Sequence, residues 1–156
     1  MVKAPITPPL LLLCIALCAA ACGPVEIAEE ADDAMPAAVA LDAAGLAAAD
    51  LERGEILSLA CQACHPFEPD IEAEIGPNLF GVFGRRAAAD PNFEYSEALR
   101  AVGVTWDAEN LNEWLLDPAG FVPGSAMVFA GYSDPADRRD LIAYLLARLN
   151  PERAAR

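Results

Sequence analysis

Basic residues are scarce in this 156-residue chain, and lysine occurs only once, as Lys3. Ten Lys and Arg side chains accompany 24 Asp and Glu side chains, which gives a formal net charge of -14. Nucleic-acid binding needs a basic face that neutralises phosphates, so the composition excludes that class of partner. It also excludes docking to an acidic partner through a lysine-rich surface. The chain has no internal repeat and no sustained alternation of apolar and polar residues, which argues against a β-sheet protein.

Histidine is equally scarce, because His65 is the only one in the sequence. It ends the motif Cys61-Gln62-Ala63-Cys64-His65, whose spacing is typical of covalent haem attachment: two thioethers from the cysteines and an iron ligand from the histidine. A zinc site would need a second Cys or His pair, and a thioredoxin-like dithiol would need a βαβ setting. The chain provides neither, so the motif predicts one covalently bound haem c, with His65 as the proximal iron ligand.

The sixth iron ligand is predicted by elimination. There is no other histidine, and the remaining cysteines lie in the N-terminal apolar stretch or at its edge. Of the three methionines, Met1 and Met35 lie outside the predicted domain, which leaves Met127 as the distal ligand. The alternative role for Met127 is core filler. Coordination by His and Met leaves no open position on the iron, so it predicts an electron-transfer protein rather than an enzyme, with no small-molecule substrate.

The N-terminus predicts export to the bacterial periplasm. Residues 1–21 are expected to form a signal peptide, with Lys3 before an apolar stretch too short to span a membrane and with alanines at 19–21. Cys22 follows directly, as in bacterial lipoproteins, where the cysteine is acylated and anchors the mature protein to a membrane. The leucine usual three positions earlier is replaced by Ala19. A chance cysteine behind an ordinary cleavage site is the alternative.

Composition divides the rest of the chain in two. Residues 22–48 are rich in alanine and acidic residues and lack basic and aromatic ones, which predicts an acidic, Ala-rich tether in which a helix is possible only around 41–49. Residues 49–156 are expected to form one helical domain. Its four helices are predicted to begin after polar capping residues and to show apolar residues at helical spacing. The caps are Asp50, Ser96, Asp107 and Asp134.

Residues 49–149 resemble the class I c-type cytochromes, the group of mitochondrial cytochrome c and bacterial cytochrome c2. Besides the haem motif, the likeness is carried by Gly76-Pro77-Asn78-Leu79, Gly103-Val104-Thr105-Trp106 and Pro123-Gly124-Ser125-Ala126-Met127, in the family order. The resemblance implies a small all-α fold whose helices pack around one covalent haem c. The N- and C-terminal helices are expected to cross at Gly54.

The resemblance also implies roles for further residues. Pro77 would accept a hydrogen bond from His65, and Arg85, Tyr95 and Trp106 would bind or screen a buried haem propionate. Trp114 stands where the family usually has a tyrosine near the methionine sulfur, and Leu99 stands where an asparagine is common. Both changes predict a drier haem crevice and an altered potential. The family's lysines around the haem edge are replaced at three positions: Ala119, Gly120 and Ala126.

The function implied is electron transfer between membrane respiratory or photosynthetic complexes, by a single-haem carrier tethered through Cys22. Two alternatives stay open at this point. A haem peroxidase or ligand sensor would need a labile Met127, and a dedicated electron-donor subunit of one oxidoreductase would use the same chemistry with a fixed partner.

Overall fold

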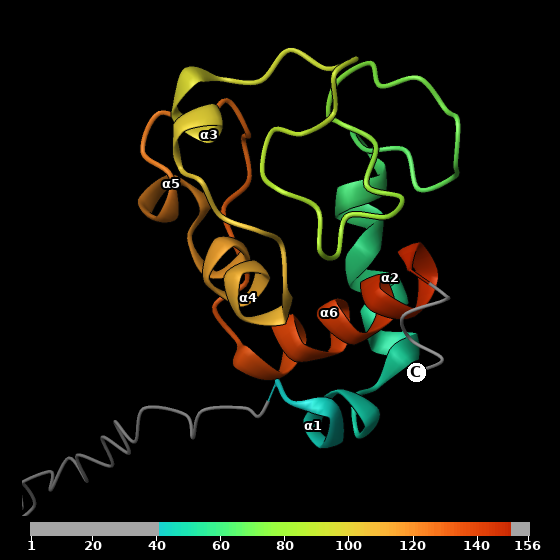
Figure 1. Ribbon diagram of the computed structural model, residues 1–156. Helices are drawn as coiled ribbons and strands as arrows, with labels where there is room; N and C mark the ends of the chain where they lie inside the picture. The colour runs from blue at the N-terminus through green and yellow to red at the C-terminus, as the bar shows by residue number, and fades with distance from the viewer. Residues whose placement is uncertain (1–40, 151–156) are drawn as a thin grey trace, which may run out of the picture. The chain divides into compact units, whose positions relative to one another are not determined.

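The computed structural model describes residues 41–150, and this part of the chain is all-α, as predicted (Figure 1). It contains no β-strand, only an isolated antiparallel bridge between Arg86 and Thr105. The predicted signal peptide and Cys22 lie outside the described residues. The helices are α1 (Ala43–Ala47), α2 (Leu51–Gln62), α3 (Glu97–Ala101), α4 (Ala108–Leu116), α5 (Pro118–Phe121) and α6 (Pro135–Leu149).

The four predicted helices begin at their predicted caps. In each, the capping side chain accepts a hydrogen bond from a backbone N–H of the first turn, which satisfies a group that the helix itself cannot pair. The pairs are Asp50 with Arg53, Ser96 with Leu99, Asp107 with Asn110, and Asp134 with Ala136. These side chains therefore fix where α2, α3, α4 and α6 start.

The frame of the domain is the crossing of α2 and α6, which lie against each other in Figure 1. Leu141, Ile142 and Leu149 of α6 are completely buried in the core. Gly54 of α2 faces the backbone of Asp140 so closely that a Cβ would overlap its carbonyl. The crossing at Gly54 confirms the arrangement expected from the family. It places the C-terminal end of α2, and with it the haem motif, at one side of the domain.

Two short helices were not among the four predicted. Asp42 caps α1, which packs against α6, and Leu41 and Leu46 contact the core. Residues 41–48, which composition assigned to the tether, are therefore part of the folded domain in this structure. Asp117 caps α5, whose first residue is Pro118, so the proline that ends α4 also begins the next helix.

The apolar residues predicted for α2 do not all face the core. Leu51, Ile56 and Leu59 are exposed, with Leu59 at 61%. Among the described residues, no helix is both long and apolar enough to cross a membrane.

Candidate haem site

The haem motif lies at the C-terminal end of α2. Cys61 is in the last turn, and the backbone N–H of His65 donates to the Cys61 carbonyl oxygen at 2.9 Å, so the chain turns tightly after the helix. Both cysteines are free thiols; Cys61 is half-buried and Cys64 is exposed. Burial raises the pKa of Cys61 to about 11. Two sulfur atoms one helical turn apart are thus available for thioether formation.

The ring of His65 is held in one orientation by Pro77. Its Nδ1 lies 2.7 Å from the Pro77 carbonyl oxygen, and because a carbonyl can only accept, Nδ1 carries the proton and donates it. Burial lowers the pKa of His65 despite the opposing effect of this hydrogen bond, so the ring is neutral. Nε2 then keeps a lone pair, which is the form of imidazole that binds a metal.

Gly76 determines how closely the chain can approach that ring. Its N–H donates to the Cys64 carbonyl oxygen at 2.9 Å, which draws the segment against the motif. A Cβ at Gly76 would lie 2.7 Å from His65 Nδ1, so any side chain here would displace the imidazole. The glycine therefore permits the hydrogen bond between His65 and Pro77.

All nine side chains predicted for the haem site line a single cavity of about 340 Å³. The segment that carries Met127 follows α5, on the side of the domain away from the C-terminal end of α2 (Figure 1). Residues from both sides of the domain therefore line the same cavity. The nine residues are Cys61, Cys64, His65, Pro77, Arg85, Tyr95, Trp106, Trp114 and Met127.

A tight turn presents Met127 to this cavity. Gly124 has a φ of +89°, a left-handed conformation that glycine adopts without a steric penalty. The N–H of Ser125 donates to the Val122 carbonyl oxygen at 3.0 Å, and the Ser125 hydroxyl accepts from the N–H of Met127 at 3.3 Å. The turn is therefore set by the Pro-Gly-Ser sequence that precedes the methionine.

Aromatic rings form the dry wall of the cavity. Trp114 is buried, with 7% of its surface exposed, and contacts Trp106 edge to face at 5.5 Å between ring centroids. Phe121 also packs edge to face against Trp114, at 6.2 Å between ring centroids. Leu99, Leu111 and Leu115 add apolar surface to the lining. Little of this wall can hold water.

The cavity wall around Arg85 and Tyr95 is polar. The Arg85 guanidinium donates to the carbonyl oxygens of Asn78 at 2.6 Å and Phe80 at 3.2 Å, which fixes it beside the cavity. Burial raises the pKa of Tyr95, while the positive charge of Arg85 opposes the rise. This part of the lining can accommodate an anionic group.

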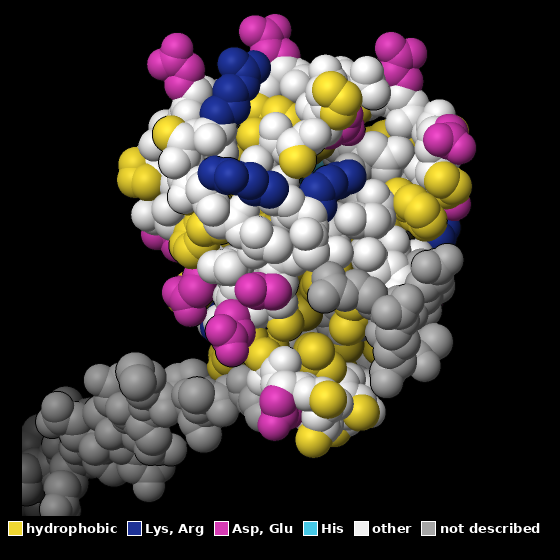
Figure 2. Space-filling model, viewed as in Figure 1, with side chains coloured by type: hydrophobic (Ala, Val, Ile, Leu, Met, Phe, Trp, Pro, Cys, Tyr) yellow, Lys and Arg dark blue, Asp and Glu magenta, His cyan; other side chains and the backbone are white. Residues whose placement is uncertain are grey.

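The lining residues to which the sequence analysis gave no role in the site include Arg86, Phe93 and Ser125. Phe93 packs edge to face on Tyr95 at 4.9 Å. Arg86 follows Arg85 directly. The sequence alone does not show which of two adjacent arginines faces the cavity, so Arg86 could not be assigned to the site in advance. On the face seen in Figure 2, acidic side chains lie mostly around the rim, while basic side chains gather in the upper half. On this face the basic side chains are therefore not evenly spread.

Comparison with known proteins identifies the family, although no protein-family model matches the chain. The chain is 39% identical to cytochrome c2 of Rhodomicrobium vannielii over 109 residues, 70% of this chain and 87% of that protein. It is 46% identical to cytochrome c of Chlamydomonas reinhardtii over 99 residues, 63% of this chain and 88% of that protein. The chain belongs to the class I cytochrome c family.

A solved structure supports the same assignment for this cytochrome c. Cytochrome cH from Methylobacterium extorquens superimposes with a TM-score of 0.57 at 44% identity, covering 62% of this chain and 96% of that one. The cofactor is one covalently bound haem c, and the protein is a single-haem electron carrier rather than an enzyme. The cavity fits this cofactor, because two free thiols, a neutral imidazole and a thioether all line it.

Proposed function

We propose that this cytochrome c carries electrons between membrane respiratory or photosynthetic complexes in the bacterial periplasm, with His65 and Met127 as its iron ligands. Cys61 and Cys64 would form the two thioethers. The observation that carries the ligand assignment is the shared cavity: the only histidine of the chain and Met127 line the same space as both thiols. The other two methionines, Met1 and Met35, lie outside the described residues.

The haem supplies a one-electron couple, and the residues around it determine how that couple is used. Pro77 holds His65 in a single tautomer and orientation, which keeps a strong nitrogen ligand on the iron. Met127 completes the coordination and thereby excludes oxygen and substrates from the metal. A thioether ligand also raises the reduction potential relative to a second nitrogen ligand.

The two kinds of cavity wall have separate tasks in this proposal. The buried indoles of Trp106 and Trp114 exclude water from the cofactor. Arg85, Arg86 and Tyr95 would hold the propionates, since an ionised carboxylate out of water is costly unless it is paired with a cation or hydrogen-bonded.

The surface beside the distal ligand suggests how partners are approached. Residues 118–133, which include Met127, contain no charged side chain, although the whole chain has a net charge of -14. Ala119 and Ala126 are exposed there, and Val128 is fully exposed at 101%. A partner that docks on this surface meets apolar groups, so the segment itself supplies no charge attraction for the encounter.

A membrane tether would compensate for the weak charge steering. In this proposal residues 1–21 are removed as a signal peptide and Cys22 is acylated. A coil with the length of this tether, from Cys22 to Leu41, would span on the order of 25 Å. Confinement within that radius raises the effective concentration at a membrane partner without any new contact.

The ligand assignment is tested by a redox-titrated visible spectrum of the exported protein and of Met127→Ala. We expect the wild-type ferric protein to show the methionine–iron charge-transfer band near the red end of the spectrum. Met127→Ala should lose that band, bind external ligands and have a lower potential. An unchanged spectrum would exclude Met127 as a ligand.

The tether is tested separately by fractionation and mass spectrometry of the mature N-terminus. We expect the haem protein in the membrane fraction with a diacylglyceryl mass on Cys22, and globomycin should block its maturation. Cys22→Ser should release it to the soluble periplasm. A wild-type protein that is soluble and unmodified would refute the anchor and leave the haem assignment intact.

A further inference from the structure

The six residues after Met127, Val128 to Ser133, are fixed to three helices of the domain. Gly131, with a φ of +87°, passes so close to the end of α4 that a Cβ would overlap the carbonyl oxygen of Leu116. The N–H of Tyr132 then donates to the Leu115 carbonyl oxygen at 2.8 Å. We call these six residues the methionine loop. Its backbone is thus anchored on α4 five residues after the methionine.

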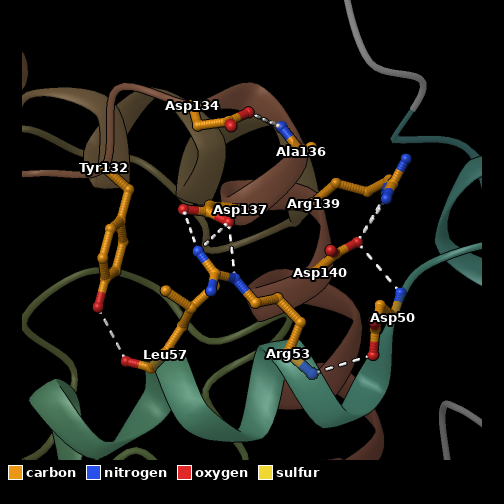
Figure 3. A network of polar contacts seen from close by, with 9 residues as sticks. All are labelled: Asp50, Arg53, Leu57, Tyr132, Asp134, Ala136, Asp137, Arg139 and Asp140. Carbon is orange, nitrogen blue, oxygen red and sulfur yellow. Dashed lines mark hydrogen bonds and ion pairs between the residues drawn. The ribbon is translucent and has the colours of Figure 1, made fainter.

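The Tyr132 side chain joins this loop to α2. Its hydroxyl donates to the carbonyl oxygen of Leu57 at 2.9 Å, as Figure 3 shows. Leu57 lies one helical turn before Cys61, so the bond connects the loop that follows Met127 with the helix that carries a haem cysteine. The Tyr132 ring also packs edge to face on Phe129 at 5.2 Å. Ring and hydroxyl therefore make separable contributions.

Arg138 of α6 holds the end of the same loop. Its guanidinium donates to the carbonyl oxygens of Tyr132 at 2.7 Å and Ser133 at 2.8 Å, and to Asn112 Oδ1 of α4 at 2.8 Å. The side chain is only 6% exposed. The end of the methionine loop is thus fixed to α4 and α6. The Tyr132 hydroxyl adds the connection of this loop to α2.

We propose that Tyr132 is a positioning residue that keeps Met127 on the iron by tying the methionine loop to α2. The inference rests on the proposed function, in which Met127 is the distal ligand. Displacement of a methionine requires its loop to move away. A hydrogen bond that exists only in the closed loop lowers the population of the open form, and one such bond changes that population about 3- to 10-fold.

The test uses the ferric holoprotein and imidazole, an external ligand that binds the iron only after Met127 has left. Its apparent affinity therefore reports the open population. Tyr132→Phe removes the hydroxyl and retains the ring on Phe129. We expect this variant to bind imidazole about 3- to 10-fold more tightly than the wild type, at neutral pH and with the same absorption spectrum before imidazole is added.

Tyr144→Phe is the matched control, because Tyr144 lies at the α2–α6 crossing and does not line the cavity. It should leave the imidazole affinity unchanged, even if its unfolding midpoint in denaturant shifts as far as that of Tyr132→Phe. Equal increases in affinity for both variants would mean general loosening of the domain, and would overturn the positioning role.

Met127→Ala separates the two proposals. If the wild type lacks the methionine–iron band and Met127→Ala binds imidazole as the wild type does, Met127 is not a ligand and both proposals fall. If the band is present and Met127→Ala binds imidazole far more tightly, the ligand assignment stands. In that case, a Tyr132→Phe affinity equal to that of the wild type overturns the role of Tyr132 alone.

Discussion

Gly54 and Asp140 bring the backbones of α2 and α6 into contact. A Cβ on Gly54 would overlap the carbonyl oxygen of Asp140 and would lie 2.7 Å from the Tyr144 Cβ. Polar contacts on both sides fix the crossing. The Asp140 carboxylate accepts from the N–H of Asp50 at 3.2 Å, and Arg53 pairs with Asp137 through two hydrogen bonds of 2.9 and 3.0 Å (Figure 3). These contacts lie near the N-terminal end of α2. The helix is therefore fixed to α6 at the end opposite to the haem motif.

Gly54→Ala tests this contact. Alanine stabilises an open helix by about 1 kcal/mol relative to glycine, so propensity alone predicts a more stable protein. The overlap with Asp140 predicts the reverse, a loss of about 2–3 kcal/mol in the free energy of unfolding, because both backbones must shift. Denaturant unfolding of the holoprotein measures the difference. Leu59→Ala, an exposed change on the same helix, should stay within about 0.5 kcal/mol of the wild type.

The sequence was sufficient to predict the features that depend on local chemistry. Each of the four helices begins at an Asp or Ser side chain that satisfies a free N–H, and the requirement is local. The haem motif could be recognised from five consecutive residues alone. Met127 could be selected because the sequence offers so few alternative ligands. That Met127 binds the iron stays a prediction.

The remaining features depend on contacts between distant segments. Residues 41–48 have the composition of a linker, yet α1 is held by Leu41 and Leu46 packing on the core. Leu59 suits a buried helix face, but the face of α2 that meets α6 is instead the one with Gly54. Nothing near Tyr132 in the sequence indicates that its hydroxyl reaches Leu57, 75 residues away.

Gly76→Ala is expected to disturb the proximal ligand. The new Cβ would approach the His65 ring, so the hydrogen bond to Pro77 must lengthen or the segment must move, at a cost of about 1–3 kcal/mol in stability. The midpoint potential should also change, because that hydrogen bond tunes the imidazole. Gly81→Ala is the control: it strains a φ of +71° by about 1–2 kcal/mol but meets no atom within 4 Å. An unchanged potential in Gly76→Ala, or an equal shift in Gly81→Ala, would contradict the expectation.

Alkaline pH is expected to destabilise the fold through Tyr132. Burial raises the pKa of Tyr132 above its usual value of 10.0, with negative neighbours such as Asp137 adding to the rise. The folded state therefore favours the neutral phenol. The resulting stability is complete below about pH 10 and is lost as the pH rises through the folded-state pKa. Deprotonation also removes the donor to Leu57.

Melting temperatures between pH 8 and 11.5 measure this effect. The wild type should lose stability steeply above pH 10, and Tyr132→Phe should lose less over the same interval. A smaller alkaline loss should remain in the variant, because burial also raises the pKa of Tyr95. Parallel curves for the two proteins would show that Tyr132 does not contribute.

Charge placed beside the distal ligand should change the reaction with small redox ions. The net charge of -14 repels ferricyanide, so its rate of reaction with the ferrous protein should rise with ionic strength. Ala119→Lys combined with Ala126→Lys adds two cations to the uncharged segment 118–133. We expect about a 3- to 10-fold faster reaction at low salt and little difference at about 1 M salt, where the Debye length is near 3 Å. Stopped-flow kinetics measure both limits.

The matched control carries the same two added charges at the C-terminal end of α1, as Ala47→Lys in the helix and Ala48→Lys at its C-cap. Both positions are exposed, and α1 lies well away from α5 in Figure 1. The two double variants are compared near physiological salt, where screening limits the reach of a surface charge to about 8–10 Å, so lysines at positions 47 and 48 should accelerate ferricyanide far less than lysines near Met127. Hexaammineruthenium, a cation, should respond with the opposite sign to both the salt and the lysines near Met127. If the two double variants accelerate ferricyanide equally, net charge alone governs the rate, and the uncharged segment is not where electrons leave the protein.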